Sequence, residues 1–270
     1  MQQALHLDAV EARIEVQSLL QYVLRRNRAW VLAHDDEALD AGRQAVYAAL
    51  LRRRLQGEPV AYILGEREFF GLPFKVTPAT LIPRPETELL VELALLRITQ
   101  GMSCRVLDLG TGSGAIALSI AHERPDVAVT AVDASAEALK VAECNAQVLA
   151  IRNVDFLCSN WFEELGGRNF ELIVSNPPYV AAGDPHLGQG DLPFEPLSAL
   201  AAGADGLDDI RKIVAGAPVH LRQGGWLLLE HGYNQAAQVR ELLCAQGFGA
   251  VFSARDLAGV ERVSGGRLGT

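Results

Sequence analysis

Residues 105–121 read RVLDLGTGSGAIALSIA: an apolar run, a glycine-rich turn and a second apolar run. The first run predicts a short buried strand, and the second predicts a helix. Gly110, Gly112 and Gly114 allow the backbone of the turn to approach a ligand closely, while the first turn of the helix offers unpaired N–H groups. Together these features predict an α/β sheet that binds a small molecule beyond the carboxyl ends of its strands.

The spacing of the glycines narrows the class of ligand. A dinucleotide fold requires Gly-x-Gly-x-x-Gly and a P-loop requires Gly-Lys before Ser or Thr, and neither pattern occurs in Gly110-Thr111-Gly112-Ser113-Gly114. The next apolar run, residues 127–132, ends in Asp133, at roughly the spacing at which such folds place an acid on ribose hydroxyls. We therefore expect residues 110–114 and Asp133 to hold a ligand that contains a ribose.

A second informative stretch, Asn176-Pro177-Pro178-Tyr179, ends the apolar run 170–175. The prolines have no N–H group and push the residue before each of them away from the helical region, so the corner is stiff and its carbonyls are free. Such a corner can hold a flat group that bears an NH₂, with oxygens accepting both hydrogens and the tyrosine ring covering the face. The alternative interpretation is a strand-ending turn with a core tyrosine.

Strand and helix patterns alternate from residue 86 onward, which predicts a doubly wound, seven-stranded and mostly parallel sheet whose last strand is antiparallel. The predicted strands are residues 105–109, 127–132, 154–157, 172–175, 225–230, 249–253 and 262–267. We expect a small all-α domain over residues 1–71, with helices at 9–24 and 38–55. A hairpin and a proline-rich connector follow over residues 72–85, and the sheet domain occupies residues 86–270.

Composition argues against several functional classes. The formal net charge is −9, and residues 1–75 carry equal numbers of basic and acidic side chains, so the acidic excess falls on the remainder. An acidic domain repels a phosphate backbone, which argues against a nucleic-acid substrate. The four cysteines lack metal-ligand spacing, so we expect free thiols in a reducing compartment and no metal site. Without a leader or an apolar run of membrane-spanning length, the expected protein is soluble, cytoplasmic and monomeric.

The motifs in this order resemble those of class I S-adenosylmethionine-dependent methyltransferases, and among these the release factor glutamine methyltransferases, the PrmC/HemK family. The resemblance covers nearly the whole chain and is weakest in the N-terminal segment. The matching stretches are residues 81–88 (LIPRPETE), 108–118, 174–179, 184–187 (DPHL), 190–191, 194–196 (FEP), 229–232 (LEHG) and 261–263 (ERV).

This resemblance implies an enzyme that moves a methyl group from S-adenosyl-L-methionine to the N5 nitrogen of a glutamine side chain. The glutamine would lie in the Gly-Gly-Gln loop of peptide chain release factors. The resemblance also places Trp161 in the adenosine pocket, whereas Asn160 departs from the acid that relatives carry there. Arg84 is expected either at the mouth of the active site or in an interdomain salt bridge. Residues 52–54, three consecutive arginines, are expected to be solvated near the negative end of a helix; the alternative is that they help to grip an acidic or RNA-associated partner.

Three alternative functions are weighed against this one. A sister enzyme methylates glutamine on a ribosomal protein, but residues 184–196 look like the release factor branch. A nucleic-acid adenine N6 methyltransferase binds a similar planar amino group, but it must flip a base and hold a phosphate backbone. A non-catalytic protein that binds the cofactor is expected to have lost Asn176 or the glycines, and all of them are present.

Overall fold

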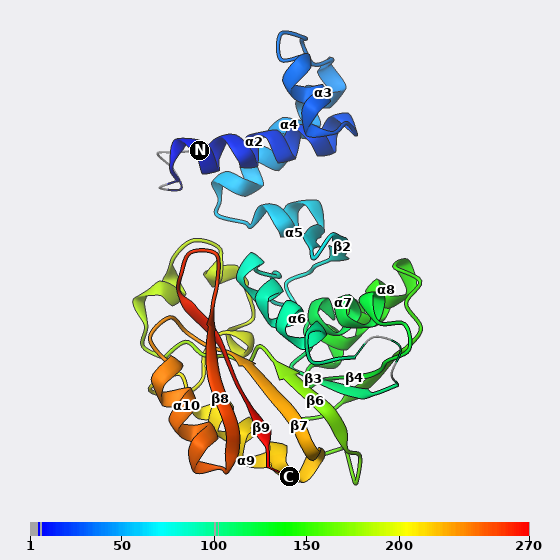
Figure 1. Cartoon of the computed structure of the whole chain (residues 1–270). Coiled ribbons are helices and arrows are strands. Elements are labelled where there is room, and N and C mark those ends of the chain that lie inside the picture. Colours follow the sequence, from blue (N-terminus) through cyan, green and yellow to red (C-terminus); the bar gives the residue numbers. More distant parts are fainter. Residues whose placement is uncertain (1–4, 6, 100, 102, 270) are drawn as a thin grey trace.

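The computed structural model describes residues 5, 7–99, 101 and 103–269, and in it a helical part stands on a larger part built around a sheet (Figure 1). The helical part contains α2 (Ala9–Leu24), α3 (Arg28–Ala33), α4 (Ala41–Leu55) and α5 (Val60–Leu64). Asp8 caps α2 by accepting hydrogen bonds from the backbone N–H groups of Val10 and Glu11, and the Glu11 carboxylate accepts a hydrogen bond from the Asp8 backbone N–H. Leu19, Leu50 and Ile63 join α2, α4 and α5 in a small apolar core.

The three consecutive arginines near the end of α4 differ in their surroundings, and the prediction that all of them are solvated is wrong for Arg54. Arg52 is exposed, whereas the Arg54 residue is only 4% exposed. Arg54 Nε and Nη2 donate to the Glu15 carboxylate of α2 at 2.8 and 2.9 Å, and Nη1 donates to Asp191 Oδ1 at 3.2 Å. The guanidinium therefore joins two helices of the helical part to the loop that contains Asp191.

Replacing Arg54 with methionine is expected to lower the free energy of unfolding by about 2 kcal/mol, because two partly buried carboxylates lose their partner. Urea denaturation followed by circular dichroism measures this change. Arg52→Met is the matched control, since Arg52 donates only to the carbonyl of its own helix, at Ala48, and it should change stability by less than about 0.5 kcal/mol. Equal stability of the two variants would contradict the assignment.

A hairpin and a stiff connector join the two parts. Strands β1 (Glu66–Phe69) and β2 (Leu72–Lys75) pair antiparallel, which confirms the predicted hairpin, although it begins before residue 71. The connector then leads into a short 3₁₀ helix, η1 (Pro85–Thr87), and α6 (Glu88–Leu95). Glu195, whose side chain is fully buried, accepts from the Ile82 backbone N–H at 3.1 Å and pairs with Arg84. The connector is thus fixed to the loop near Glu195.

The sheet confirms the predicted fold. Its strands are β3 (Arg105–Leu109), β4 (Ala128–Asp133), β5 (Val154–Cys158), β6 (Phe170–Ser175), β7 (Leu221–Glu230), β8 (Phe248–Arg255) and β9 (Glu261–Leu268). Their spatial order is β5-β4-β3-β6-β7-β9-β8, and β9 runs antiparallel to both of its neighbours. This is the antiparallel last strand that the sequence predicts.

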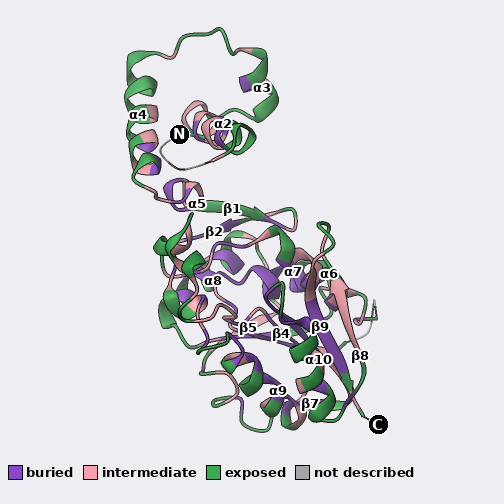
Figure 2. Cartoon of the chain, turned by 90° about the vertical axis from the view of Figure 1, so that its left-hand side faces the viewer, coloured by how far each residue is buried: buried purple, intermediate pink, exposed green. Residues whose placement is uncertain are grey.

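Helices cover both faces of the sheet, and the strands are accordingly apolar on both faces. On one face, Val106 packs with α6, α7 (Ala115–Glu123) and part of α8 (Ala136–Val148). On the other face, Leu107 and Leu109 pack with α9 (Asp208–His220) and α10 (Ala236–Ala245). Figure 2 shows this buried centre, in contrast with the largely exposed helical part. Among the described residues, no helix has the length and apolar character needed to cross a membrane.

Candidate active site

A cavity of about 540 Å³ opens at the carboxyl edge of the sheet, where β3, β4 and β6 end side by side. Leu109 at the end of β3 is in register with Val132 of β4 and with Ser175 of β6, so the residues that follow these strands converge. Of the residues predicted to form the site, the lining contains Gly110, Thr111, Gly112, Ser113, Asp133, Trp161, Asn176 and Pro178. Gly114, Pro177 and Tyr179 adjoin these residues in the chain but are not part of the lining.

The glycine turn adopts a backbone that only glycine tolerates well, since the φ angles of Gly110, Gly112 and Gly114 are +73°, +56° and +83°. Gly112 faces open space, because a Cβ atom there would meet nothing within 4 Å. Gly114 serves helix packing, since a Cβ would lie 3.0 Å from Leu118 Cδ1 and 3.2 Å from Ala142 Cβ. The turn therefore presents bare backbone to the cavity while α7 and α8 pack closely behind it.

Two carboxylates support this turn. Asp108 is fully buried, and burial raises its pKa to about 7, although hydrogen bonds from Thr111 and from the Ala117 backbone oppose the rise. Thr111 Oγ1 donates to Asp108 Oδ2 at 2.6 Å. Asp133 Oδ2 accepts from the Gly112 N–H at 2.9 Å, and Oδ1 accepts from the Ser135 N–H at 2.8 Å. Asp133 thereby fixes the turn and still borders the cavity.

The same edge offers a flat aromatic wall. Trp161 has a φ of +51°, a backbone that non-glycine residues rarely adopt, and its ring lies about 3.5 Å from where a Cβ of Gly110 would be. Neighbouring Asn160 donates through Nδ2 to Glu163 Oε1 at 2.7 Å and also lines the cavity. An acid placed for ribose hydroxyls, an indole face for adenine and bare backbone for an amino-acid group together fit S-adenosyl-L-methionine.

The corner after β6 is held by bonds to four other parts of the chain. Ser175 Oγ donates to the Leu109 carbonyl at 2.7 Å, which ties the ends of β6 and β3 together. Asn176 Nδ2 donates to Thr87 Oγ1 of η1 at 3.1 Å, so its Oδ1 remains available as an acceptor. The Tyr179 hydroxyl donates to Glu230 Oε1 at the end of β7, at 3.3 Å.

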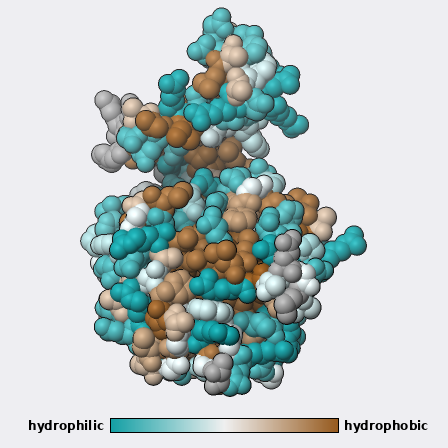
Figure 3. Space-filling model, viewed as in Figure 1, coloured by the Kyte–Doolittle hydropathy of each residue, from teal (hydrophilic) through white to brown (hydrophobic). Residues whose placement is uncertain are grey.

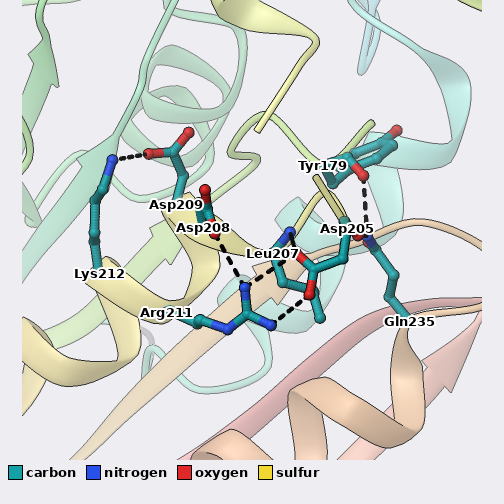
Figure 4. A network of polar contacts seen from close by, with 8 residues as sticks. All are labelled: Tyr179, Asp205, Leu207, Asp208, Asp209, Arg211, Lys212 and Gln235. Carbon is teal, nitrogen blue, oxygen red and sulfur yellow. Dashed lines mark hydrogen bonds and ion pairs between the residues drawn. The ribbon is translucent and has the colours of Figure 1, made fainter. Parts of the chain in front are cut away.

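Gln235 fixes the far end of this corner (Figure 4). Its Nε2 donates to the carbonyls of Tyr179 and Asp205 at 3.0 and 3.2 Å, and its Oε1 accepts from the Gly232 N–H at 2.8 Å. Gly206 packs against the same point, because a Cβ there would lie 2.2 Å from the Tyr179 carbonyl oxygen. Sequence reasoning did not assign Gln235 or Gly206 to the site.

Replacing Gly206 with alanine is expected to displace Tyr179 and to lower the rate of the reaction catalysed at this cavity about tenfold, equivalent to about 1.4 kcal/mol. The φ of +76° adds strain to the steric conflict. Steady-state kinetics, together with a melting curve to confirm folding, test this effect. Gly183→Ala, where a Cβ would meet nothing within 4 Å, is the control and should remain near wild type. Unchanged kinetics in a folded Gly206→Ala protein would show that the packing at Gly206 does not position the corner.

Sequence reasoning also missed Thr87, Glu230 and Glu195, which contact the site from distant parts of the chain. Thr87 and Glu230 lie within stretches 81–88 and 229–232, which match the family pattern. The sequence therefore pointed to these residues but did not indicate which groups they contact. Arg84 combines both of its expected positions, because it lines the cavity and pairs with Glu195 of the loop.

Comparison with known proteins identifies the family of this chain. Family models match residues 3–65 as the PrmC N-terminal domain and residues 86–189 as the methyltransferase small domain. A release factor glutamine methyltransferase from Burkholderia pseudomallei is 55% identical over 268 residues, which is 97% of this chain and 93% of that protein. Proteins of the same name from Xylella fastidiosa (strain Temecula1) and Escherichia coli (strain K12) are 52% and 49% identical, each over 94% of this chain and over 93% and 92% of their own lengths.

Solved structures show the same fold at lower sequence identity. The 16S rRNA N2 G1207 methyltransferase of T. thermophilus, in complex with AdoMet and guanosine, is 22% identical with a TM-score of 0.57, covering 75% of this chain and 49% of that chain. A methyltransferase from Pyrococcus furiosus gives a TM-score of 0.56 at 20% identity, covering 83% of this chain and all of that chain. With about half of its residues shared with curated relatives over nearly its full length, the chain belongs to the family of release factor glutamine methyltransferases.

Proposed function

We propose that this protein transfers a methyl group from S-adenosyl-L-methionine to the side-chain nitrogen, N5, of the glutamine in the Gly-Gly-Gln loop of peptide chain release factors. The observation that supports this most strongly is the position of Asn176. Its Nδ2 is engaged by Thr87, so its carbonyl oxygen is free at the same cavity that the glycine turn and Asp133 border.

The cofactor supplies a methyl group bound to a positively charged sulfur, which leaves as a neutral thioether. Residues 110–114 would form the cradle for the methionine part, with Gly110 to Ser113 at the cavity and Gly114 behind them. Asp133 accepts hydrogen bonds from the ribose hydroxyls, and Trp161 covers the adenine. The Asp133 carboxylate accepts from the backbone N–H groups of Gly112 and Ser135 and also borders the cavity, where it can accept from a ribose hydroxyl.

The corner after β6 orients and polarises the glutamine amide. An amide nitrogen is a poor nucleophile because its lone pair is delocalised into the carbonyl group. The Asn176 side-chain oxygen and the Pro177 backbone carbonyl would each accept one N–H hydrogen, which raises electron density on nitrogen and directs it at the methyl group. The N–C bond would form as the C–S bond breaks, and the nitrogen, which is acidic only after the transfer, would then release one proton to water. Pro178 keeps the corner rigid. Tyr179, whose ring is anchored through its hydroxyl to Glu230, stacks on the amide plane.

The helical part gives the enzyme a second contact with its large protein substrate. We assign residues 1–71 to this substrate-engaging domain, residues 72–85 to the part of the hairpin from β2 onward together with the connector, and residues 86–270 to the methyltransferase domain. On α2, the side chains of Val10, Ile14 and Tyr22 are exposed, and Figure 3 shows apolar surface on both parts of the molecule and at the waist between them. A release factor that spans both parts would cover such surface.

The remaining assignments follow from this substrate. The four cysteines are free thiols, as expected in a reducing compartment, and we place the enzyme in the cytoplasm with its translation partner. We also propose that the enzyme is active as a monomer. The acidic sheet domain does not favour nucleic acid as a direct substrate.

Incubation with radiolabelled cofactor and, separately, a release factor, a ribosomal protein and DNA tests the proposed function. We expect label on the release factor alone, at the loop glutamine, identified by mass spectrometry. A release factor with alanine in place of that glutamine is the matched control and should remain unlabelled. Label on DNA or on the ribosomal protein, with none on the release factor, would overturn the proposal.

A further inference from the structure

A buried histidine, His231, follows the end of β7 and takes no part in the proposed chemistry. The residue is fully buried, and both nitrogens of its ring have polar partners. His231 Nδ1 lies 3.0 Å from the carbonyl oxygen of Gly232, and Nε2 lies 2.8 Å from Ser264 Oγ on β9. Ser264 is also fully buried. A ring that is satisfied on both sides in this way is fixed in its orientation.

The partners of His231 determine which nitrogen carries the proton. A carbonyl oxygen only accepts, so Nδ1 is the protonated nitrogen and donates to Gly232. In a neutral ring Nε2 is then bare, and it accepts from the Ser264 hydroxyl.

The surroundings favour the neutral ring. Burial lowers the pKa of His231, and the positive charges of Arg262 and Arg240 lower it further. The bond to Gly232 and the charge of Glu261 act in the opposite direction, but the net change is downward. The ring is therefore uncharged at pH 7 and above.

Two serines connect His231 to the edge of the sheet. Ser253 on β8 is in register with Ser264, and their Oγ atoms lie 2.7 Å apart. Arg240 on α10 donates through Nη1 to Ser253 Oγ at 2.6 Å. A guanidinium only donates, so Ser253 accepts from Arg240 and passes its own hydrogen to Ser264, which donates to His231. Each hydroxyl thus accepts one hydrogen bond and donates one.

On its other side, His231 supports the turn that contains Gln235. The Gly232 carbonyl, which accepts from His231, also accepts from the Gln235 backbone N–H at 3.0 Å, and the Gly232 N–H donates to Gln235 Oε1 at 2.8 Å. Gln235 Nε2 therefore faces the carbonyls of Tyr179 and Asp205, at 3.0 and 3.2 Å (Figure 4). The reversed amide would place its oxygen against two carbonyls and its NH₂ against an N–H group, so only one orientation fits.

We propose that Gln235, His231 and Ser264 are positioning residues for methyl transfer, because a directed chain of hydrogen bonds that starts at Arg240 fixes the turn 231–235, and this turn holds the Tyr179 carbonyl. The inference rests on the proposed function and adds to it the residues that place the ring stacked on the substrate amide. None of the three positioning residues is part of the cavity lining. They act through Tyr179 and do not touch the reacting groups.

Steady-state methylation of a release factor by Gln235→Glu tests the end of the chain nearest the site. Glutamate keeps the shape but replaces the NH₂ group with an oxygen that both carbonyls repel, so we expect kcat to fall about tenfold. The KM for the release factor and the dissociation constant for the cofactor should change less than about twofold, since the substitution lies outside the cavity. Gln246→Glu adds the same charge at an exposed position after the same helix and should match wild type.

Ser264→Ala tests the chain from its far side, where it removes the hydroxyl that donates to His231. We expect kcat to fall about threefold, with KM unchanged. Ser119→Ala is the control, because Ser119 is equally buried, in α7, and its hydroxyl has no partner among the described residues. A double variant, Ser264→Ala with Gln235→Glu, should be no slower than Gln235→Glu alone, since both interrupt one chain. Effects that multiply to about thirtyfold would show two independent supports and would overturn the chain.

Nuclear magnetic resonance provides readouts that do not depend on turnover. In protein labelled with ¹⁵N-histidine, the His231 ring, assigned by its absence from His231→Asn, should carry its proton on Nδ1. The backbone amide signal of Val180, whose peptide group contains the Tyr179 carbonyl, should shift in Gln235→Glu and in Ser264→Ala but not in the two controls. Melting curves confirm that the variants fold.

The outcomes separate this inference from the proposed function. If the Val180 signal shifts as expected but wild-type protein methylates no release factor, the proposed function fails and the chain stands. A wild-type His231 with its proton on Nε2, or an unchanged Val180 signal in folded Gln235→Glu, would overturn the chain. The tautomer is read in wild-type protein, so this test holds even where a variant does not fold.

Discussion

Replacing Asn176 with alanine is expected to slow methyl transfer to a release factor by about two orders of magnitude or more. The variant loses the oxygen that we propose as an acceptor for the substrate amide, and each such hydrogen bond in a water-free site is worth about 1–3 kcal/mol. The loss should appear mainly in kcat, because the Asn176 oxygen acts most strongly on the nitrogen as it begins to bond to the methyl carbon. Single-turnover kinetics with labelled cofactor measure the chemical step directly.

Two controls make this experiment decisive. A melting curve and the dissociation constant for S-adenosyl-L-methionine should remain close to wild type, because Asn176 borders the glycine turn without bonding to it. Asn176→Asp keeps an oxygen at the cavity but removes the N–H group that Thr87 accepts, so it should also be slow. A folded Asn176→Ala protein with turnover near that of wild type would refute the two-acceptor mechanism.

Replacing Asp133 with alanine is expected to weaken cofactor binding about a hundredfold, since hydrogen bonds to a charged group contribute about 1.5–3 kcal/mol each. The substitution removes the carboxylate that we propose as the acceptor of the two ribose hydroxyls. It also frees the Gly112 N–H, which Asp133 Oδ2 holds at 2.9 Å, so the turn loses one of its supports. Isothermal titration calorimetry with S-adenosyl-L-methionine measures the affinity.

Glu137 provides the matched control for Asp133. It also borders the cavity, but it is exposed and pairs with Lys140 on its own helix at 2.6 Å. Glu137→Ala should therefore change the dissociation constant less than about threefold. Dissociation constants for Asp133→Ala and Glu137→Ala that agree within experimental error would show that the ribose does not bind at Asp133.

Much of the fold was accessible from the sequence because parallel sheets have a simple local signature. Buried strands are short apolar runs, and glycine or proline ends them abruptly, as at Gly110 and Pro177. Ligands bind beyond the carboxyl ends of parallel strands. The residues that follow these strand ends were therefore predicted to lie together at one site. The structure brings Gly110, Asp133 and Asn176 to one cavity, as that argument requires.

The parts that sequence could not supply depend on contacts between distant segments. Arg54 looks like any arginine in the last turn of a helix, and only its contacts with Glu15 and Asp191, 39 and 137 residues away, make it buried. Thr87 meets Asn176 across 89 residues of chain. No local pattern of hydrophobicity or spacing encodes such pairings, because their partners are fixed only when the connector docks against the sheet domain.

The position of β9 has a consequence for synthesis of the protein on the ribosome. Strand β8 is attached to the sheet through β9, which is made after it, and Val263 of β9 lies opposite Glu230. Before β9 has left the ribosome, β7 is therefore an open edge of the sheet, and β8 has no strand with which to pair. Such non-local pairing folds slowly and late. The Asn176–Tyr179 corner, which is bonded to Glu230 of β7 through Tyr179, is thus expected to gain its full support only after β9 has paired with β7.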